Sequence, residues 1–153
     1  MSVPRGTGFT LVEVLIVVVI MAVLAAIVMP RVQDTSRSAK ESTLDHNMHA
    51  LRSQSELYRL DHLGSYPVIQ DNDLPQVTRA TNSAGNAGTP GPAYPYGPYV
   101  VGGLPPNPFD GSRKVTAVAT PGRKPTTAVG VLGGWQYDVT TGEIWPNHAD
   151  YYR

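Results

Sequence analysis

Glu13 is the one charged residue in an apolar run that extends from Phe9 to Met29. A carboxylate inside an apolar helix costs about 2.5–3.5 kcal/mol on insertion scales, so it needs a chemical reason. A cut between Gly8 and Phe9 would supply one, because it would create a free α-amine close to Glu13. Opposite charges about 4 Å apart attract by about 4 kcal/mol at an effective dielectric near 20, before desolvation. The spacing therefore predicts that Glu13 of one subunit neutralises the amine of a neighbouring subunit.

A second group of residues able to do chemistry lies further along the chain, at Asp45, His46 and His49. These side chains can recruit a metal ion, but on a polar helix they are more often a solvated face. His62 and His148 have no recognisable partners in the sequence, and no Gly-rich phosphate loop follows a strand. No catalytic constellation can be assembled, so we expect that the chain is not an enzyme.

The composition excludes several classes of protein. The 153 residues carry 12 basic and 12 acidic side chains, without the basic excess that nucleic-acid binding normally requires, so no nucleic-acid partner is expected. There is no cysteine, which removes disulfides, thiolate metal sites and cysteine nucleophiles. Most of the glycine and proline lies beyond residue 64, whereas apolar residues are concentrated in the first thirty positions.

The apolar run over residues 9–29 is predicted to be a transmembrane helix. It would be about 31 Å long, enough to cross the bilayer core, and it has no polar stripe. Two alternatives are a secretory signal peptide, with Arg5 in its charged region and cleavage at residues 23–25, and a plain signal anchor. Neither alternative gives Glu13 a role.

The segment from Gly8 to Glu13 (Gly-Phe-Thr-Leu-Val-Glu), followed by an apolar run, resembles the class III signal of type IV pilins and type II secretion pseudopilins. In that family a prepilin peptidase cuts after the glycine and methylates the new N-terminus. The resemblance implies cleavage between Gly8 and Phe9, N-methylation of Phe9 and subunit registration by Glu13. Pro30 matches the family's helix-kinking proline, where a missing N–H and a ring clash bend the helix.

The resemblance also implies a topology and a set of partners. The leader, residues 1–8, would be cytoplasmic and cleaved, and the chain would cross the inner membrane once, with its C-terminal domain in the periplasm. After cleavage the subunit would enter a pseudopilus filament, a homopolymer with other pseudopilins. An inner-membrane assembly platform and its ATPase would drive that assembly.

The rest of the chain is predicted to form a small extracytoplasmic domain. Residues 30–63 favour a continuation of the helix, and Leu44, Met48, Leu51 and Tyr58 recur at helical spacing, with Leu57 and Leu60 widening the apolar face. Residues 64–112 form a Pro/Gly-rich variable region, and residues 113–153 are predicted to be β-structure. The expected fold is α+β: a pilin-like lollipop whose long N-terminal helix packs on a small antiparallel sheet.

Within the β region, residues 113–120 and 126–132 are predicted to be two short strands. Residues 135–139 and 143–145 are predicted to form a hairpin in which Trp135, Tyr137 and Val139 share one face over the helix. This hairpin resembles that of pseudopilin G-like proteins, which makes the major pseudopilin the closest branch. The tyrosine- and proline-rich run over residues 94–99 suggests either a carbohydrate platform or, more often, a loop packed on the core.

Calcium is the one cofactor that the resemblance raises, because major pseudopilins commonly bind Ca²⁺ in a C-terminal loop through carboxylates and carbonyl oxygens. The available carboxylates are those of Asp110, Asp138, Glu143 and Asp150, but the closely spaced acidic loop is missing, and no metal ligands are assigned. The sequence therefore predicts a structural pseudopilin of type II secretion. A type IV pilin for adhesion, twitching motility or DNA uptake is the alternative, and a membrane-anchored glycan-binding domain is the second.

Overall fold

The computed structural model describes residues 9–152, with the exception of the side chains of residues 27–34. It divides into two compact units, Met1–Ala39 and Lys40–Arg153. Within the residues described, no helix combines the length and the apolar character needed to cross a membrane. The transmembrane helix expected over residues 9–29 therefore stays a prediction.

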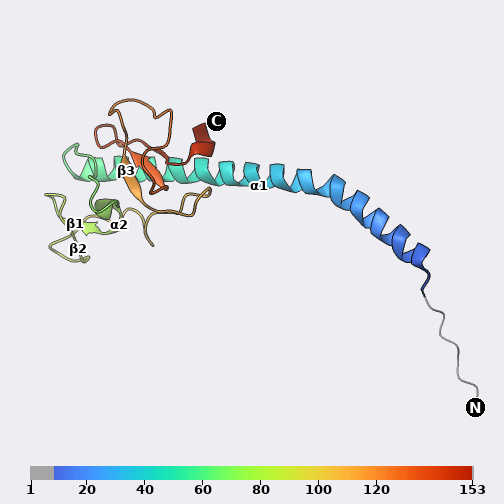
Figure 1. Ribbon diagram of the computed structural model, residues 1–153. Helices are drawn as coiled ribbons and strands as arrows, with labels where there is room; N and C mark the ends of the chain where they lie inside the picture. Colours follow the sequence, from blue (N-terminus) through green and yellow to red (C-terminus); the bar gives the residue numbers. More distant parts are fainter. Residues whose placement is uncertain (1–8, 153) are drawn as a thin grey trace, which may run out of the picture. The chain divides into compact units, whose positions relative to one another are not determined.

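Helix α1 spans Leu11–Asp61 as one element of 51 residues and contributes to both units (Figure 1). Its backbone stays helical at Pro30, and the predicted bend there falls among the residues whose side chains are outside the described set. The helix ends at a turn in which the Gly64 N–H donates to the Arg59 carbonyl at 2.9 Å. Leu63 and Gly64 both have a positive φ in this turn, as a left-handed helix stop requires.

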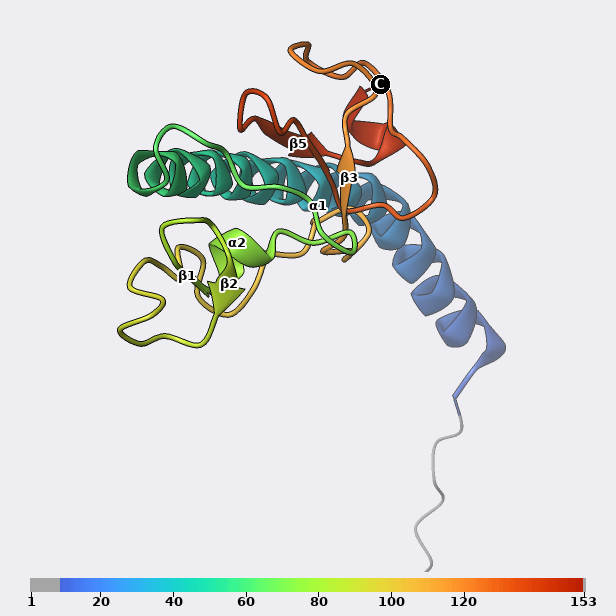
Figure 2. The same cartoon turned by 90° about the vertical axis from the view of Figure 1, so that its left-hand side faces the viewer.

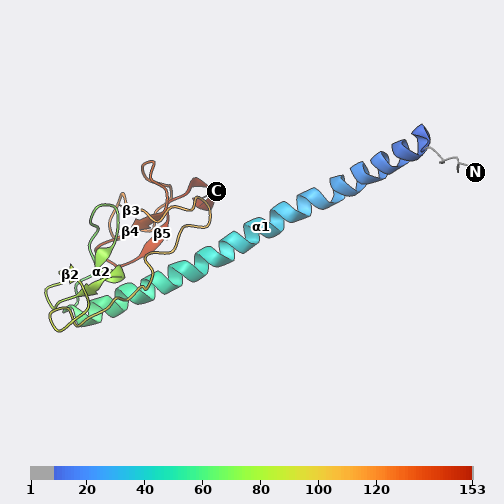
Figure 3. The ribbon, with the colours of Figure 1, turned by 90° about the horizontal axis from the view of Figure 1, so that it is seen from below.

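The second unit is organised around one face of α1. Leu44, Met48, Leu51 and Tyr58 are all buried, which confirms the stripe that the sequence predicts. Leu57 and Leu60 were expected to widen this face, but they lie on the opposite side of the helix, and Leu60 is 72% exposed. The strands and α2 lie along one side of the C-terminal part of α1 (Figure 3).

Residues 64–112 contain little regular structure. They hold the short helix α2 (Pro75–Thr78) and a two-stranded antiparallel ribbon of β1 (Ala80–Thr81) and β2 (Ala87–Gly88). These elements lie near the end of α1, whereas β3 and β5 lie across an earlier part of the helix (Figure 2). Three side chains of this irregular region, Leu74, Val77 and Leu104, are buried in the same core as the apolar face of α1.

The main sheet has three strands in the order β3 (Val115–Ala117), β4 (Trp135–Tyr137) and β5 (Ile144–Pro146). β4 and β5 form the predicted antiparallel hairpin, but β3 and β4 are parallel, so the expectation of a purely antiparallel sheet is wrong. The reason is the long connection over residues 118–134. It returns the chain to the end of the sheet at which β3 starts, so β4 runs in the same direction as β3. A parallel pair needs such a crossover, whereas a tight turn would have produced a hairpin.

The same connection explains a second correction. The strand expected over residues 126–132 does not form, and residues 118–134 are a loop that covers β4. β4 is therefore buried on both faces, with Trp135, Gln136 and Tyr137 each fully enclosed. Val139 was expected to share the inner face of Trp135 and Tyr137, but it lies beyond the end of the strand and is 41% exposed. The last described residues, Ala149–Tyr152, form a short 3-10 helix.

Candidate functional site

The start of α1 is organised by a reciprocal pair of hydrogen bonds between Thr10 and Glu13. The Glu13 N–H donates to Thr10 Oγ1 at 3.2 Å, and the Thr10 N–H donates to Glu13 Oε2 at 2.9 Å. The Thr10 hydroxyl also donates to Glu13 Oε2 at 2.9 Å. This pattern is a capping box, in which two backbone donors that the first helical turn leaves unpaired are both satisfied.

In the capping box, the two oxygens of the Glu13 carboxylate differ in their hydrogen bonding. Oε2 accepts both hydrogen bonds from Thr10, whereas Oε1 accepts none among the described residues. Phe9, which precedes the cap, is 87% exposed. Gly8, the other residue of the predicted cleavage site, lies outside the described residues. The arrangement holds a carboxylate at the positive end of the helix dipole with one oxygen available to an external cation.

The carboxylates raised as calcium ligands do not converge. Within the described part of the chain, no group of three or more His, Cys, Asp or Glu side chains is placed to hold a metal ion. Glu143 Oε2 lies 2.8 Å from Nε of Arg52 on α1, and Asp150 Oδ2 lies 3.8 Å from Nδ1 of His148. Asp110 and Asp138 bind main-chain N–H groups of the loops around β4.

Asp138 has the best-defined electrostatic environment of these carboxylates. Burial by itself would raise its pKa, but hydrogen bonds from Thr140 and from the Gly122 N–H outweigh that effect and hold the pKa below its ordinary value. A group with a lowered pKa in the folded state stabilises the fold at pH values above its unfolded pKa, near 3.9. It loses that contribution as the pH falls through the folded value.

We therefore expect Asp138→Asn to cost about 2 kcal/mol at pH 7, because one charge-assisted acceptor becomes an amide donor facing the Gly122 N–H. The difference in unfolding free energy between wild type and variant should shrink as the pH is lowered from about 6 to about 3. Urea unfolding followed by tryptophan fluorescence at a series of pH values measures it. A difference that stays constant over this range would contradict the assignment to an ionised Asp138.

Two of the four histidines have contacts that the sequence does not indicate. His46 and His49 are exposed on α1 beside Asp45, as expected for a solvated face. His62, for which the sequence offers no partner, is buried, and its ring stacks on that of Tyr58 with centroids 3.8 Å apart. His148 stacks on Phe109 with centroids 5.5 Å apart.

The two ring nitrogens of His62 link the end of α1 to the β1 region. Nδ1 lies 2.9 Å from the Tyr58 carbonyl oxygen, and Nε2 lies 3.0 Å from the Asn82 carbonyl oxygen. The hydroxyl of Thr81 is 3.1 Å from Nε2. The spacing of Tyr58 and His62 by one helical turn was visible in the sequence, but the contacts with residues 81 and 82 required the fold.

The tyrosine-rich loop packs inward. Tyr96 and Tyr99 meet the His62 and Tyr58 rings edge to face, with centroids 5.2 and 5.6 Å apart. The Tyr99 hydroxyl donates to Asp61 Oδ2 at 2.8 Å. Burial, followed by this hydrogen bond, raises the pKa of Tyr99. These contacts favour the interpretation of residues 94–99 as a loop packed on the core over that of a carbohydrate platform.

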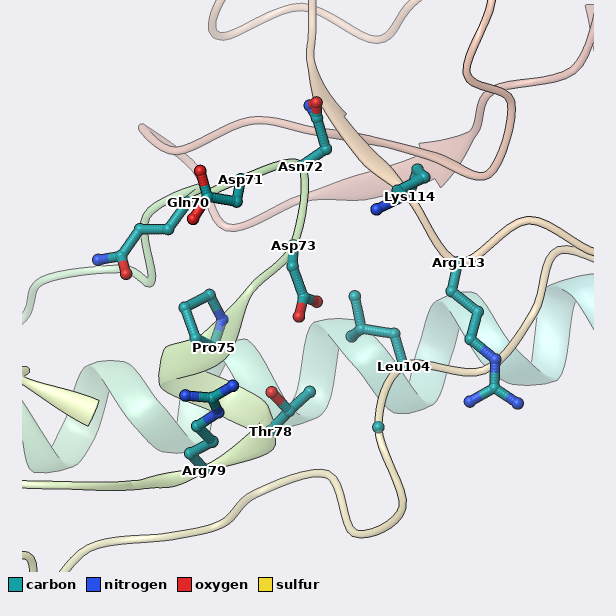
Figure 4. A pocket seen from close by; sticks show the side chains of 11 residues that line it. Gln70, Asp71, Asn72, Asp73, Pro75, Thr78, Arg79, Leu104, Arg113 and Lys114 are labelled. Carbon is teal, nitrogen blue, oxygen red and sulfur yellow. The ribbon is translucent and has the colours of Figure 1, made fainter. Parts of the chain in front are cut away.

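A hollow of about 560 Å³ lies between α2, the turn over residues 70–73 and residues 113–114, which precede β3. Figure 4 shows Asp73 and Lys114 directed toward its middle, whereas the Arg113 guanidinium turns outward. Charges of both signs line it, from Asp71, Asp73, Arg79, Arg113 and Lys114. These side chains are exposed, and the hollow contains no histidine or cysteine to act as a base or nucleophile. We assign no chemistry to it.

Comparison with known proteins bears on the N-terminal site directly. Residues 5–29 match the model of the prokaryotic N-terminal methylation motif, so the match includes the capping box. The chain is 33% identical over 79 residues to the type II secretion system core protein G of Pseudomonas aeruginosa, covering 52% of this chain and 55% of that protein. It is 32% identical over 96 residues to the core protein G of Klebsiella pneumoniae, covering 63% and 64%.

A type IV pilus protein is also similar, over a shorter stretch. The chain is 43% identical over 49 residues to a major component of the type IV narrow pilus of Thermus thermophilus, covering 32% of this chain and 42% of that protein. No solved structure matches significantly. The chain spans about half the length of the curated relatives that it matches first. The chain therefore carries an N-terminal methylation motif and is similar to core proteins G over about half of its length.

Proposed function

We propose that this protein is a structural subunit of a type II secretion pseudopilus that is polymerised through its N-terminal helix. A prepilin peptidase cuts between Gly8 and Phe9 and methylates the new Phe9 amine. The observation that carries the proposal is the methylation motif over residues 5–29, in which Glu13 is already held in place at the start of a helix. Similarity to core proteins G supports secretion as the process served.

The capping box gives the proposed assembly step a physical basis. Because Oε2 of Glu13 binds Thr10 of its own chain, the carboxylate is fixed before a neighbour arrives. Oε1 then accepts the Phe9 amine of the adjacent subunit, which neutralises both charges in an apolar filament core. A prepositioned acceptor loses less side-chain entropy on binding than a free one, so the pair selects one axial register between helices.

The proposed location follows from the apolar run that contains Glu13. Residues 9–29 lie in the inner membrane before assembly, and the second unit lies in the periplasm. The resemblance to pseudopilins supports a platform in that membrane and a cytoplasmic ATPase as the machinery that extracts and adds subunits. The pseudopilin family is structural, and the protein acts mechanically by entering and extending a filament.

The direct test is N-terminal mass analysis of the protein purified from its native membrane. The expected mature chain begins at Phe9 and carries one added methyl group. A chain that retains Met1, or one that begins near Ala26, would contradict processing of this class and would remove the filament proposal with it. Deletion of the gene should then block secretion across the outer membrane, and the cargo should accumulate in the periplasm.

A type IV pilin is the second candidate function, supported by the similarity to the narrow-pilus component. It shares the whole N-terminal site, so processing cannot separate the two. Long filaments on the surface of wild-type cells, with normal secretion in the deletion strain, would favour the pilin. Secretion lost on deletion, with no surface filaments at native expression, would favour the pseudopilin.

A further inference from the structure

Calcium is the ion that the pseudopilin resemblance implies, and the donor atoms around the C-terminal loop do not suit it. Ca²⁺ takes six to eight oxygen ligands, and these need free lone pairs. Both oxygens of Asp110 accept main-chain hydrogen bonds, Oδ1 from Ser112 at 2.8 Å and Oδ2 from Gly134 at 2.9 Å. The same carboxylate therefore joins the start and the end of the segment that forms β3 and its following loop.

Asp138, which directly follows β4, also accepts hydrogen bonds through both of its carboxylate oxygens. Its Oδ1 accepts hydrogen bonds from the N–H and the hydroxyl of Thr140, at 2.8 and 2.6 Å, and its Oδ2 accepts the Gly122 N–H at 2.5 Å. The side chain is 1% exposed. It is enclosed among donors, which is the opposite of the surroundings that a cation requires.

Asn147 supplies the third contact, and it does so without a charge. Its Oδ1 accepts the Val129 N–H at 2.7 Å, and its Nδ2 donates to the carbonyl oxygens of Val129 at 2.8 Å and Gly133 at 3.2 Å. Carbonyl oxygens of this kind complete calcium sites in loops. Here the two carbonyls already accept from the Asn147 amide, and that amide would direct its N–H groups at an incoming cation.

We propose that the loop over residues 118–134 is held by these three side chains, the Asp110–Asp138–Asn147 clamp, in place of a metal ion. Each clamp residue binds main-chain groups of the loop directly, at Gly122, Val129, Gly133 and Gly134. The two charges are satisfied by hydrogen bonds, and the third member is neutral. The second unit therefore folds and keeps its loop ordered with no requirement for calcium.

The test is the thermal unfolding of the full processed chain in detergent, with about 2 mM CaCl₂, MgCl₂ or chelator. Trp135 and Trp145 are buried in the second unit, so their fluorescence reports its unfolding. A calcium site with a Kd of about 20 µM would raise the Tm by about 5–10 °C under these conditions. We expect the three Tm values to agree within about 1 °C.

Substitutions distinguish a residue of the clamp from a metal ligand, because only the loss of a metal ligand should change the response of the Tm to calcium. Asp138→Ala and Asn147→Ala should lower the Tm by several degrees, and by the same amount with calcium as with chelator. Asp45→Ala, which removes an exposed carboxylate from α1, is the matched control and should leave the Tm unchanged. If Asn147→Ala does not fold, Asn147→Asp keeps the shape and one acceptor while losing both donors, and should give a smaller fall.

Two outcomes would overturn the proposal. The first is a saturable rise of several degrees with calcium in the wild type that Asp138→Ala abolishes, which would make Asp138 a metal ligand. The second is a Tm in both Asp138→Ala and Asn147→Ala equal to that of wild type. Neither outcome depends on whether filaments form, so the result is independent of the proposed secretion role.

Discussion

Glu13→Ala is expected to leave cleavage after Gly8 intact and to abolish filament assembly. The variant loses the acceptor for the neighbour's Phe9 amine, which then lies unpaired in an apolar core. An ion pair at about 4 Å and an effective dielectric near 20 is worth about 4 kcal/mol before desolvation, or about a thousandfold in each subunit contact. Mass analysis of the N-terminus measures processing, and pelleting of sheared filaments with electron microscopy measures assembly.

Two further substitutions at this site distinguish the effect of the Glu13 charge from the effect of the helix cap. Glu13→Gln keeps an oxygen that can accept the Thr10 N–H but removes the negative charge, so it should fail to assemble as Glu13→Ala does. Thr10→Val removes the hydroxyl that accepts the Glu13 N–H while keeping the carboxylate, and should reduce assembly only in part. Normal filaments from Glu13→Gln would show that capping, and not charge pairing, is what assembly needs.

The largest expected loss of stability within the second unit follows from Gly134→Ala. Gly134 has φ of 73°, and a Cβ built there would collide with the Lys114 main chain across the β3–β4 pair. The left-handed conformation costs a non-glycine residue about 1–2 kcal/mol, and the overlap adds about 1–3 kcal/mol. We expect the Tm to fall by about 6–12 °C, measured by tryptophan fluorescence on heating.

Gly122→Ala is the matched control for this prediction. Gly122 has nearly the same backbone conformation, with φ of 76°, but no atom lies within 4 Å of the position of a Cβ. Its substitution should cost only the conformational strain, about 1 kcal/mol, and lower the Tm by about 2–4 °C. Equal effects at the two glycines would mean that strain alone acts at Gly134 and that the close approach to Lys114 relaxes freely.

The parts of the fold that were predictable from the sequence are those with short-range periodicity. The helical spacing of Leu44, Met48, Leu51 and Tyr58 identified the buried face of α1, because a helix repeats every 3.6 residues. The alternation around Trp135 and Tyr137, followed by a Thr-Gly turn, identified the β4–β5 hairpin. In both cases the residues that decide the structure are neighbours in the chain.

The parts that were missed depend on contacts between distant residues. Residues 126–132 are rich in Thr and Val, which favour a strand, but they take no part in the sheet, in which β3 pairs directly with β4. Asn147 was overlooked because an isolated asparagine carries no pattern, and its partners lie 14 and 18 residues earlier. The capping box at Thr10 was detectable, because a threonine three residues before a glutamate is its signature.

The clamp contacts the loop over residues 118–134 almost entirely through main-chain atoms. Gly122, Val129, Gly133 and Gly134 are each bound by an N–H or a carbonyl oxygen, groups that nearly every amino acid supplies. The clamp does not use the intervening side chains: Val131 is 98% exposed, and Lys124 lies over the Tyr151 ring, 5.9 Å from its centroid. Between Arg123 and Ala128, apart from the Lys124 contact with Tyr151, we therefore expect the sequence to tolerate substitution without a change in the course of the backbone. This makes that stretch the natural place to carry a tag, an epitope or a new specificity on the outside of the subunit.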